Sequence, residues 1–203
     1  MKFICIGRNY LDHIKEFNSS IPTEPIFFIK PETALLLKRQ PFFIPDFSQN
    51  VHYELELIIK ICKVGKNIQE KFAHTYYDEI GVGIDFTARD IQSQCIKNGL
   101  PWEISKGFDG SAVVGTLFPK NKFEDINNID FHLLLNDFIV QKGNSKNMVF
   151  GFDKLISYVS QFVTLKMGDI LFTGTPSGVG PVKINDILEG YIAQEKSFKI
   201  LVK

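Results

Sequence analysis

Short strand-like segments dominate this sequence and constrain its fold more than any other feature. These segments are rich in β-branched and aromatic residues or alternate apolar with polar positions, as strands do. They span residues 2–6, 26–29, 53–62, 81–85, 131–141, 169–173 and 197–202. Asn136 and Asp137 divide the fifth segment and predict a two-residue hairpin turn. At least part of the sheet is therefore expected to be antiparallel.

Helices are fewer, and each of the three that we expect has a recognisable start. Asn67 can cap one helix, Asp153 can cap another, and a third follows Thr87. The helix after Thr87 has Asp90 where a side chain can reach back to the cap, and it should end near Gly99. The helix after Asp153 keeps apolar residues at helical spacing, namely Leu155, Ile156, Val159, Phe162 and Val163. Short helices among many strands predict an α+β, mostly β architecture.

Composition favours one compact domain over residues 1–203. Of the 203 residues, 44% are hydrophobic, which is enough for one sizeable core. Lys plus Arg equals 23 and Asp plus Glu equals 23, so no global field would attract nucleic acid or an anionic membrane. The apolar stretch 3–6 is too short for a signal peptide, and no later run reaches the roughly 20 apolar residues of a membrane span. We therefore expect a cytoplasmic protein with no nucleic-acid or membrane partner.

Two familiar kinds of site are not indicated. Cys5, Cys62 and Cys95 are odd in number, widely spaced and set among apolar neighbours, so neither a disulfide framework nor a zinc site is predicted. The glycine-rich stretch 173–180 lacks the ending of a Walker motif and the spacing of a dinucleotide fingerprint. Neither class of nucleotide site is therefore expected.

Glu54 and Glu56 are the most informative candidate site residues. Alternate side chains of a strand share a face, so these carboxylates stand about 7 Å apart while Leu55 and Leu57 point into the core. A hard divalent cation between them would relieve their repulsion. His52 shares that face, so a His-Glu-Glu ligand set is conceivable, although a hydrogen-bonding neighbour is the commoner role. An ordinary strand with its polar face in water is the simpler interpretation of this pattern.

Asp85 is a candidate third carboxylate. It ends an apolar strand just before the helix that follows Thr87, and such junctions often carry ligand groups. It could equally accept backbone N–H bonds at the helix start. Arg89 and Gln92 are three residues apart and share a helix face that could hold an anionic or carbonyl oxygen, although solvated helix surface is the commoner meaning.

His13 and Glu16 form a candidate general-base pair. At i and i+3 on a helix, the carboxylate can orient the imidazole and raise its basicity. A surface ion pair is the commoner meaning of this spacing, and Asp12 is a competing neighbour. Lys106, in a glycine-rich stretch after Trp102, could offset the charge of the carboxylates and of an acidic substrate.

Six short motifs gain meaning when they are taken together. They are Gly7-Arg8-Asn9-Tyr10 with His13; Phe28-Ile29-Lys30-Pro31; Tyr53-Glu54-Leu55-Glu56-Leu57; Asp85-Phe86-Thr87-Ala88-Arg89-Asp90; Gly99-Leu100-Pro101-Trp102 with Lys106; and Thr173-Gly174-Thr175-Pro176 with Gly178-Val179-Gly180. Their order and spacing resemble the fumarylacetoacetate hydrolase family over nearly the whole chain. The resemblance is closest to the short stand-alone members that act as acylpyruvate hydrolases and oxaloacetate decarboxylases.

The resemblance implies a mixed β-sandwich roll with a few short helices, usually assembled as a homodimer. It also implies that Glu54, Glu56 and Asp85 hold Mg²⁺ or Mn²⁺. By the same matching, Lys106 would contact a bound 2-oxo acid, and Arg89, Gln92 and Thr175 would line the pocket.

His13 and Glu16 match the water-activating pair of the family. They lie in a segment that becomes ordered only with ligand in some relatives, so residues 1–20 are a candidate mobile lid.

The activity that the resemblance implies is Mg²⁺- or Mn²⁺-dependent chemistry on small 2-oxo acids through a metal-stabilised enolate. The leading reactions are hydrolysis of the C–C bond of acylpyruvates and decarboxylation of oxaloacetate. Alternatives are isomerisation of 2-hydroxyhepta-2,4-diene-1,7-dioate and decarboxylation of 5-oxopent-3-ene-1,2,5-tricarboxylate. A non-catalytic metal-binding protein would need the carboxylates but not His13, Glu16 or Lys106, so their joint presence counts against it.

Overall fold

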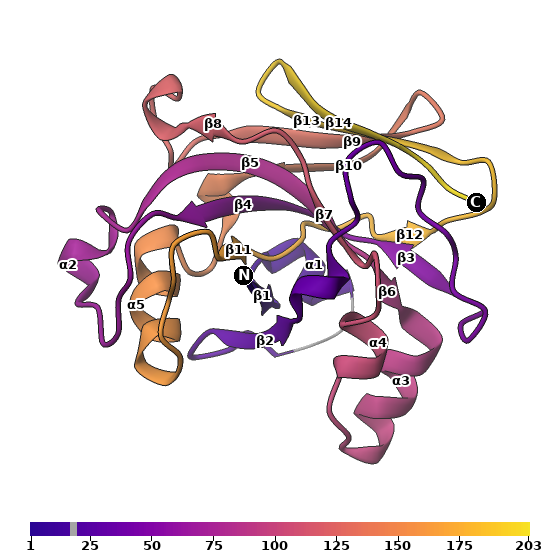
Figure 1. Ribbon diagram of the computed structural model, residues 1–203, viewed down its shortest axis with the longest axis horizontal. Coiled ribbons are helices and arrows are strands. Elements are labelled where there is room, and N and C mark those ends of the chain that lie inside the picture. Colours follow the sequence, from indigo (N-terminus) through magenta and orange to yellow (C-terminus); the bar gives the residue numbers. More distant parts are fainter. Residues whose placement is uncertain (17–19) are drawn as a thin grey trace.

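The structure, a computed structural model, describes residues 1–16 and 20–203 and is built mainly from strands (Figure 1). The strands are β1 (Phe3–Gly7), β2 (Ile26–Lys30), β3 (Val51–Tyr53), β4 (Leu55–Ile61), β5 (Tyr77–Asp85), β6 (Thr87–Ala88), β7 (Ala112–Val114), β8 (Phe118–Pro119), β9 (Asp130–Leu135), β10 (Phe138–Asn144), β11 (Ile170–Phe172), β12 (Gly180–Pro181), β13 (Ile187–Ile192) and β14 (Glu195–Leu201). The α-helices are α1 (Leu11–Glu16), α2 (Glu70–Ala73), α3 (Arg89–Asn98), α4 (Glu103–Lys106) and α5 (Phe152–Phe162). The expected mostly β, α+β class is confirmed.

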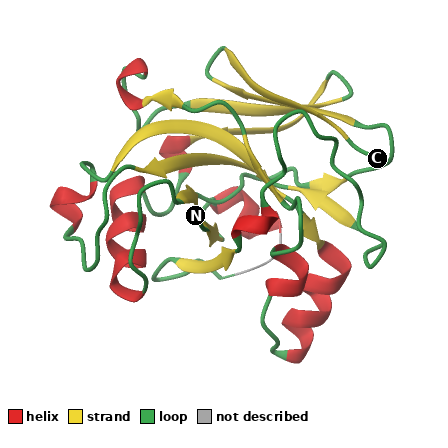
Figure 2. Cartoon of the chain, viewed as in Figure 1, coloured by secondary structure: helices red, strands yellow, loops and turns green. Residues whose placement is uncertain are grey.

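The strands form three sheets. A seven-stranded sheet has the order β2-β1-β11-β4-β5-β7, with β8 paired to β5; β1 and β11 are parallel and its other pairs are antiparallel. A four-stranded antiparallel sheet has the order β10-β9-β13-β14, and a small sheet has the order β12-β3-β6. In Figure 1, β4 and β5 arch beneath the four-stranded sheet. Figure 2 shows α2 beside α5 at one margin and α3 beside α4 at another, whereas α1 lies near the centre of the view.

Alternation along β4 decides which side chains reach the core between the two larger sheets. Leu55, Leu57 and Ile59 are fully buried in the cluster that also contains Phe131 of β9 and Leu188 of β13. Since neighbouring side chains of a strand point to opposite faces, the intervening residues turn away from that cluster. The two glutamates are therefore directed to the other face of the seven-stranded sheet, as the sequence pattern predicts.

The hairpin at Asn136 and Asp137 is confirmed. These residues join β9 to β10, and their φ angles of 50° and 69° are both positive, as a type I′ turn requires. The turn matches the right-handed twist of the flanking strands, so the local sequence alone fixes this connection.

The expected helix ends are only partly confirmed. Gly99 ends α3 in the left-handed conformation, with a φ of 64°. The expected caps are wrong: α2 begins at Glu70 after Gln69, α3 begins at Arg89 after Ala88, and α5 begins at Phe152 after Gly151. Asp90 accepts hydrogen bonds from the Ser48 hydroxyl (2.6 Å) and the Gln49 N–H (2.9 Å) in the loop before β3, and from the Ile91 N–H (2.9 Å) in the first turn of α3.

The apolar face of α5 is confirmed in its middle. Leu155, Ile156 and Val159 are fully buried, whereas Phe162 at the helix end is 56% exposed. Within the described residues, no helix is long and apolar enough to cross a membrane.

The segment expected as a lid is divided in the structure. Residues 3–7 form β1 between β2 and β11, and residues 11–16 form α1. Residues 17–19 lie outside the described residues, and the mobility of the segment stays a prediction.

Gly83 lies where the backbone behind the site is packed too closely to admit a side chain, so a substitution there tests this packing. It faces Glu56 across the β4–β5 ladder, and an added Cβ would lie 2.2 Å from the Val113 carbonyl oxygen and 2.9 Å from the Phe172 ring. We expect Gly83→Ala to lower the free energy of unfolding by about 2 kcal/mol or more in chemical denaturation, because backbone must shift to admit the methyl group. The control, Gly151→Ala, meets nothing within 4 Å and should cost about 1 kcal/mol or less. Equal costs for the two variants would contradict this account.

Candidate active site

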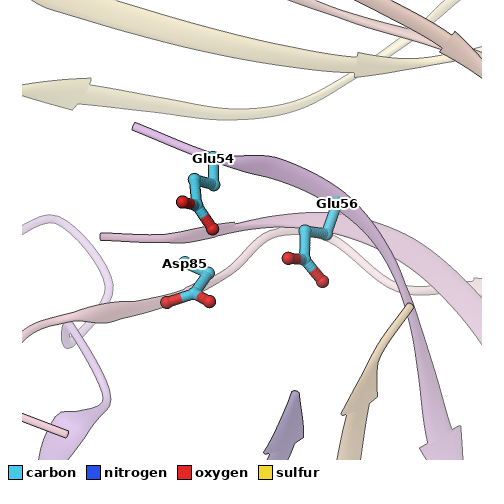
Figure 3. A group of neighbouring side chains, drawn as sticks. All are labelled: Glu54, Glu56 and Asp85. Carbon is cyan, nitrogen blue, oxygen red and sulfur yellow. The ribbon is translucent and has the colours of Figure 1, made fainter. Parts of the chain in front are cut away.

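Three carboxylates from neighbouring strands converge at one point (Figure 3). Glu54 lies between β3 and β4, Glu56 on β4, and Asp85 at the end of β5. The antiparallel register sets Leu55 opposite Ile84, and the Asp85 N–H donates to the Glu54 carbonyl oxygen at 2.9 Å. One oxygen from each carboxylate lies within 4.8 Å of the others, and all three residues are at most 5% exposed. Their close approach results from strand pairing.

Three cations lie against two of these carboxylates. Lys30 Nζ is 2.6 Å from Asp85 Oδ1, and Lys106 Nζ is 2.7 Å from Glu54 Oε2 and 2.8 Å from Asp85 Oδ2. Arg89 forms an ion pair with Glu54 Oε1. Lys30 is fully buried and Lys106 is 3% exposed, so these pairs are poorly screened by solvent.

Glu54 and Glu56 have opposite electrostatic surroundings. Burial opposes ionisation of Glu54, but Lys106 and Arg89 outweigh it and hold the pKa of its carboxyl group well below its usual range. Burial, Asp85 and Glu54 together raise the pKa of Glu56 well above its ordinary value. The charge of Lys106 and the Gly174 N–H, which donates to Glu56 Oε2 at 2.7 Å, both lower the pKa of Glu56, but they do not offset burial and the repulsion. Among the described residues, no cation forms an ion pair with Glu56.

The carboxylates fit a hard divalent cation. Mg²⁺, Mn²⁺ and Ca²⁺ prefer oxygen ligands, and a cation bound here would relieve the burial of Glu56 beside two like charges. His52 does not join the group of potential ligands found among the described residues. Its Nε2 lies 3.0 Å from Asn50 Oδ1, and burial and Arg89 lower its pKa to about 4. The His-Glu-Glu alternative is therefore not supported.

His13 and Glu16 of α1 contact one another as their spacing predicts. His13 Nδ1 lies 3.2 Å from Glu16 Oε2, and Glu16 Oε1 accepts a longer bond of 3.3 Å from the Gly178 N–H. Burial lowers the pKa of His13, although Glu54 and Glu16 oppose this shift. The competing neighbour Asp12 pairs with Lys15 instead. The imidazole is thus kept neutral, which is the form that can accept a proton.

A cavity of about 240 Å³ connects these groups. Eight of the nine residues that the sequence singled out line it, and the ninth, Glu16, contacts it through His13. Apolar side chains such as Phe28 and Trp102 form other parts of the wall. The cavity is smaller than the roughly 300–1,000 Å³ of sites for drug-sized ligands, so a small acid is the appropriate class of ligand.

The remaining predicted residues are held by specific contacts. Arg89 Nη1 donates to Gln92 Oε1 at 2.5 Å, so the two side chains share a face of α3 as expected. Thr175 Oγ1 donates to the Leu55 carbonyl oxygen at 2.9 Å, which ties its loop to the strand of the glutamates. Lys106 is the last residue of α4 rather than part of an irregular loop, because residues 103–106 complete one helical turn before Gly107.

Two buried residues to which the sequence analysis gave no role hold this site together. Lys30 is part of the Phe28-Ile29-Lys30-Pro31 motif that carries the family resemblance, and its place in an apolar strand was the signal that could have marked it. Gln141, from β10, accepts the Leu55 N–H at 2.9 Å and donates to Thr175 Oγ1 at 2.9 Å. No local pattern marks Gln141, because its partners lie 86 and 34 residues away in the chain.

Comparison with known proteins identifies the family. The family model described as fumarylacetoacetate (FAA) hydrolase, C-terminal, matches residues 2–199. The chain belongs to the fumarylacetoacetate hydrolase family. It is 41% identical over 200 residues to the bovine mitochondrial oxaloacetate tautomerase FAHD1, covering 98% of this chain and 90% of that one. It is 42% identical to the Escherichia coli oxaloacetate tautomerase YcgM, covering 92% and 86%, and 42% identical to a Dictyostelium discoideum mitochondrial oxaloacetate decarboxylase, covering 93% and 87%.

Solved structures agree with this assignment. Fumarylpyruvate hydrolase from Pseudomonas aeruginosa, solved with Mn²⁺ and pyruvate, superposes with a TM-score of 0.93 at 32% identity, covering 100% of this chain and 89% of that one. A 2-hydroxyhepta-2,4-diene-1,7-dioate isomerase from Mycobacterium marinum gives 0.86 at 28% identity, covering 99% and 73%. The fold of this chain is therefore that of the family, and the relatives named here are enzymes.

Cation binding should release a proton from Glu56. Its raised pKa means that, above the ordinary glutamate pKa of 4.5, Glu56 retains a proton that a free glutamate has lost. Because a metal ligand must be ionised, the affinity for Mn²⁺ should rise with pH until Glu56 is ionised in the metal-free protein. Titration calorimetry in buffers of different ionisation enthalpy measures the released proton.

Glu56→Gln has no carboxyl proton to release and should show weaker Mn²⁺ binding with less proton release. Glu79→Gln, outside the cavity, should behave as the wild type. The same proton release in Glu56→Gln and in the wild type would show that another group titrates.

Proposed function

We propose that this protein is an Mg²⁺- or Mn²⁺-dependent enzyme that acts on small 2-oxo acids, with oxaloacetate as the leading substrate. The convergence of Glu54, Glu56 and Asp85 beside Lys106 in a small cavity is the observation that carries this proposal. The names of the relatives at about 40% identity, which are oxaloacetate tautomerases and a decarboxylase, favour oxaloacetate over other 2-oxo acids.

Each part of the cavity has a role in this proposal. A bound Mg²⁺ or Mn²⁺ would act as a Lewis acid that stabilises negative charge on the 2-oxo oxygen. Lys106, held by Glu54 and Asp85, places a fixed ammonium group beside the acid. Arg89, Gln92 and Thr175 line the cavity around the substrate. His13 accepts the proton that tautomerisation moves, since burial favours its neutral form.

Hydrolysis of acylpyruvates is a second candidate, supported by the His13–Glu16 pair. A neutral imidazole oriented by a carboxylate can deprotonate a water that attacks the distal carbonyl group. The C–C bond then breaks with its electron pair on the pyruvate fragment, whose carbon takes up the proton, and the acyl fragment leaves as a carboxylic acid. The structural similarity to a fumarylpyruvate hydrolase favours the same reaction. Isomerisation of a 2-hydroxy-dienedioate, the activity named for the neighbour from Mycobacterium marinum, is a further alternative.

We further propose that the 203 residues act as one catalytic domain and as a homodimer, as the family resemblance implies. A cytoplasmic location is part of the same proposal. Light scattering of the purified protein tests the dimer directly.

Metal-dependent turnover of oxaloacetate is the first test. We expect activity with Mg²⁺ or Mn²⁺, none with EDTA, and a loss of at least about 100-fold in Glu54→Ala, because that change removes one metal ligand and the partner of two buried cations. Glu79→Gln is the control for a carboxylate outside the cavity. A panel of oxaloacetate, acylpyruvates and 2-hydroxy-dienedioates left untouched with either metal would favour a binding protein instead.

His13→Ala separates the candidate reactions. Tautomerisation and hydrolysis need a proton acceptor, so both should slow by about 10²- to 10⁴-fold, whereas decarboxylation needs none and should change less than about tenfold. The lowered pKa of His13 also predicts that hydrolysis by the wild type loses activity only below pH 6.5, the ordinary imidazole value, where the base becomes protonated. If His13→Ala slowed hydrolysis and decarboxylation equally, the assignment of His13 as the general base would be wrong.

A further inference from the structure

Arg8 lines the cavity but forms no ion pair with the carboxylates of the cluster. Of the cations that line the cavity, Arg89 pairs with Glu54, and Lys106 bridges Glu54 and Asp85. Arg8 lines the same cavity and is half-buried, yet within the described residues it forms no ion pair or hydrogen bond. Its guanidinium group is therefore available to a ligand.

The backbone of Arg8 is held in a conformation that an arginine rarely adopts. Its φ is 57°, in the left-handed region, which costs a residue with a Cβ about 1–2 kcal/mol. Glycine or asparagine would adopt this conformation more readily, so a long cationic side chain at a strained position beside a cavity points to a function of that side chain.

The neighbours of Arg8 fix this conformation from both sides. Gly7 ends β1 in register with Ile26 of β2. Asn9 is fully buried: its Nδ2 donates to the carbonyl oxygens of Thr173 (2.8 Å) and Phe150 (3.0 Å), and its Oδ1 accepts the Phe150 N–H at 2.8 Å. Arg8 is thus presented from a rigid turn.

The charges of the site favour a ligand with two negative groups. Lys30, Lys106 and Arg89 equal the three carboxylates in number, although they form ion pairs only with Glu54 and Asp85, so the cluster with these cations has no net charge when all the groups are ionised. On the proposed function, a divalent cation adds two positive charges, and Arg8 adds a third at the wall. A dicarboxylate offsets two of these charges and a monocarboxylate only one, so complementarity is better with the dicarboxylate.

We propose that Arg8 binds the distal carboxylate of the substrate and makes this enzyme selective for 2-oxo dicarboxylates over neutral-tailed acylpyruvates. This inference rests on the proposed function, because it takes the other end of the substrate, the 2-oxo acid, to bind at the carboxylate cluster. The planar guanidinium group suits a carboxylate, which it can bind through two parallel N–H bonds.

The kinetic test compares oxaloacetate with acetylpyruvate in the metal-loaded wild type, Arg8→Gln, Arg8→Lys and Arg39→Gln. Arg39 is the matched control, since it also has a positive φ (68°) but is exposed and outside the cavity. Arg8→Gln should lower kcat/KM for oxaloacetate about 10- to 100-fold, mainly through KM, and leave acetylpyruvate within about threefold. Arg8→Lys should recover part of the loss, because it keeps the charge without the planar fork.

A binding test separates this inference from the proposed function. 2-Oxoglutarate and 2-oxopentanoate have the same chain length and differ only in a terminal carboxylate or methyl group. Calorimetry with the Mn²⁺-loaded wild type and Arg39→Gln should show tighter binding of 2-oxoglutarate, and Arg8→Gln should remove that difference. If the wild type turned over neither substrate, the proposed function would be wrong, and a binding preference lost in Arg8→Gln would still support the role of Arg8.

Three results would overturn the role of Arg8. They are equal losses on both substrates in Arg8→Gln, an unchanged kcat/KM for oxaloacetate in that variant, and equal binding of the two matched acids by the wild type.

Discussion

The antiparallel pairing of β4 with β5 is the constraint on which the site depends. Leu55 and Leu57 are fully buried between the two larger sheets, and this burial sets the face to which Glu54 and Glu56 turn. The register of the ladder then brings Asp85 beside Glu54. The free energy of core packing thus holds three carboxylates within 4.8 Å, an arrangement that their mutual repulsion would otherwise oppose.

Burying ionised carboxylates costs free energy unless cations lie beside them, and in this cluster the cations are unevenly distributed. Lys30, Lys106 and Arg89 form ion pairs with Glu54 and Asp85, whereas the pKa of Glu56 stays raised. A buried ion pair seldom adds much stability relative to an apolar core, so such a cluster is better explained by ligand binding than by folding. Glu56, the carboxyl group without an ion pair among the described residues, is therefore the feature that favours binding of a cation.

The part of the cavity around His13 and Arg8 is built differently from the carboxylate cluster. The carboxylates are positioned by strand pairing and by Gln141, which links β10 to Leu55 and Thr175. His13 instead lies on α1 and Arg8 on the turn before it. The side-chain hydrogen bonds of Asn9 to Phe150 and Thr173 hold that turn in place.

The sequence by itself determined the features that depend on local order. Strand alternation placed Glu54 and Glu56 on one face, the Asn136-Asp137 pair specified a turn with two positive φ angles, and helical spacing paired His13 with Glu16. The family resemblance added Asp85, whose role the local pattern had left open between ligand and helix cap.

Tertiary structure decided the contacts between segments far apart in the chain. Gln141 meets Leu55 because the four-stranded sheet packs on the seven-stranded one, and Lys30 meets Asp85 within the seven-stranded sheet, across the strands that separate β2 from β5. No periodicity in the sequence encodes such long-range contacts. Asp90 likewise gains Ser48 and Gln49 as partners, which only the folded chain brings within its reach. Alternation along a strand decides to which face of the sheet a side chain points, and the packing of distant strands decides which residues it contacts on that face.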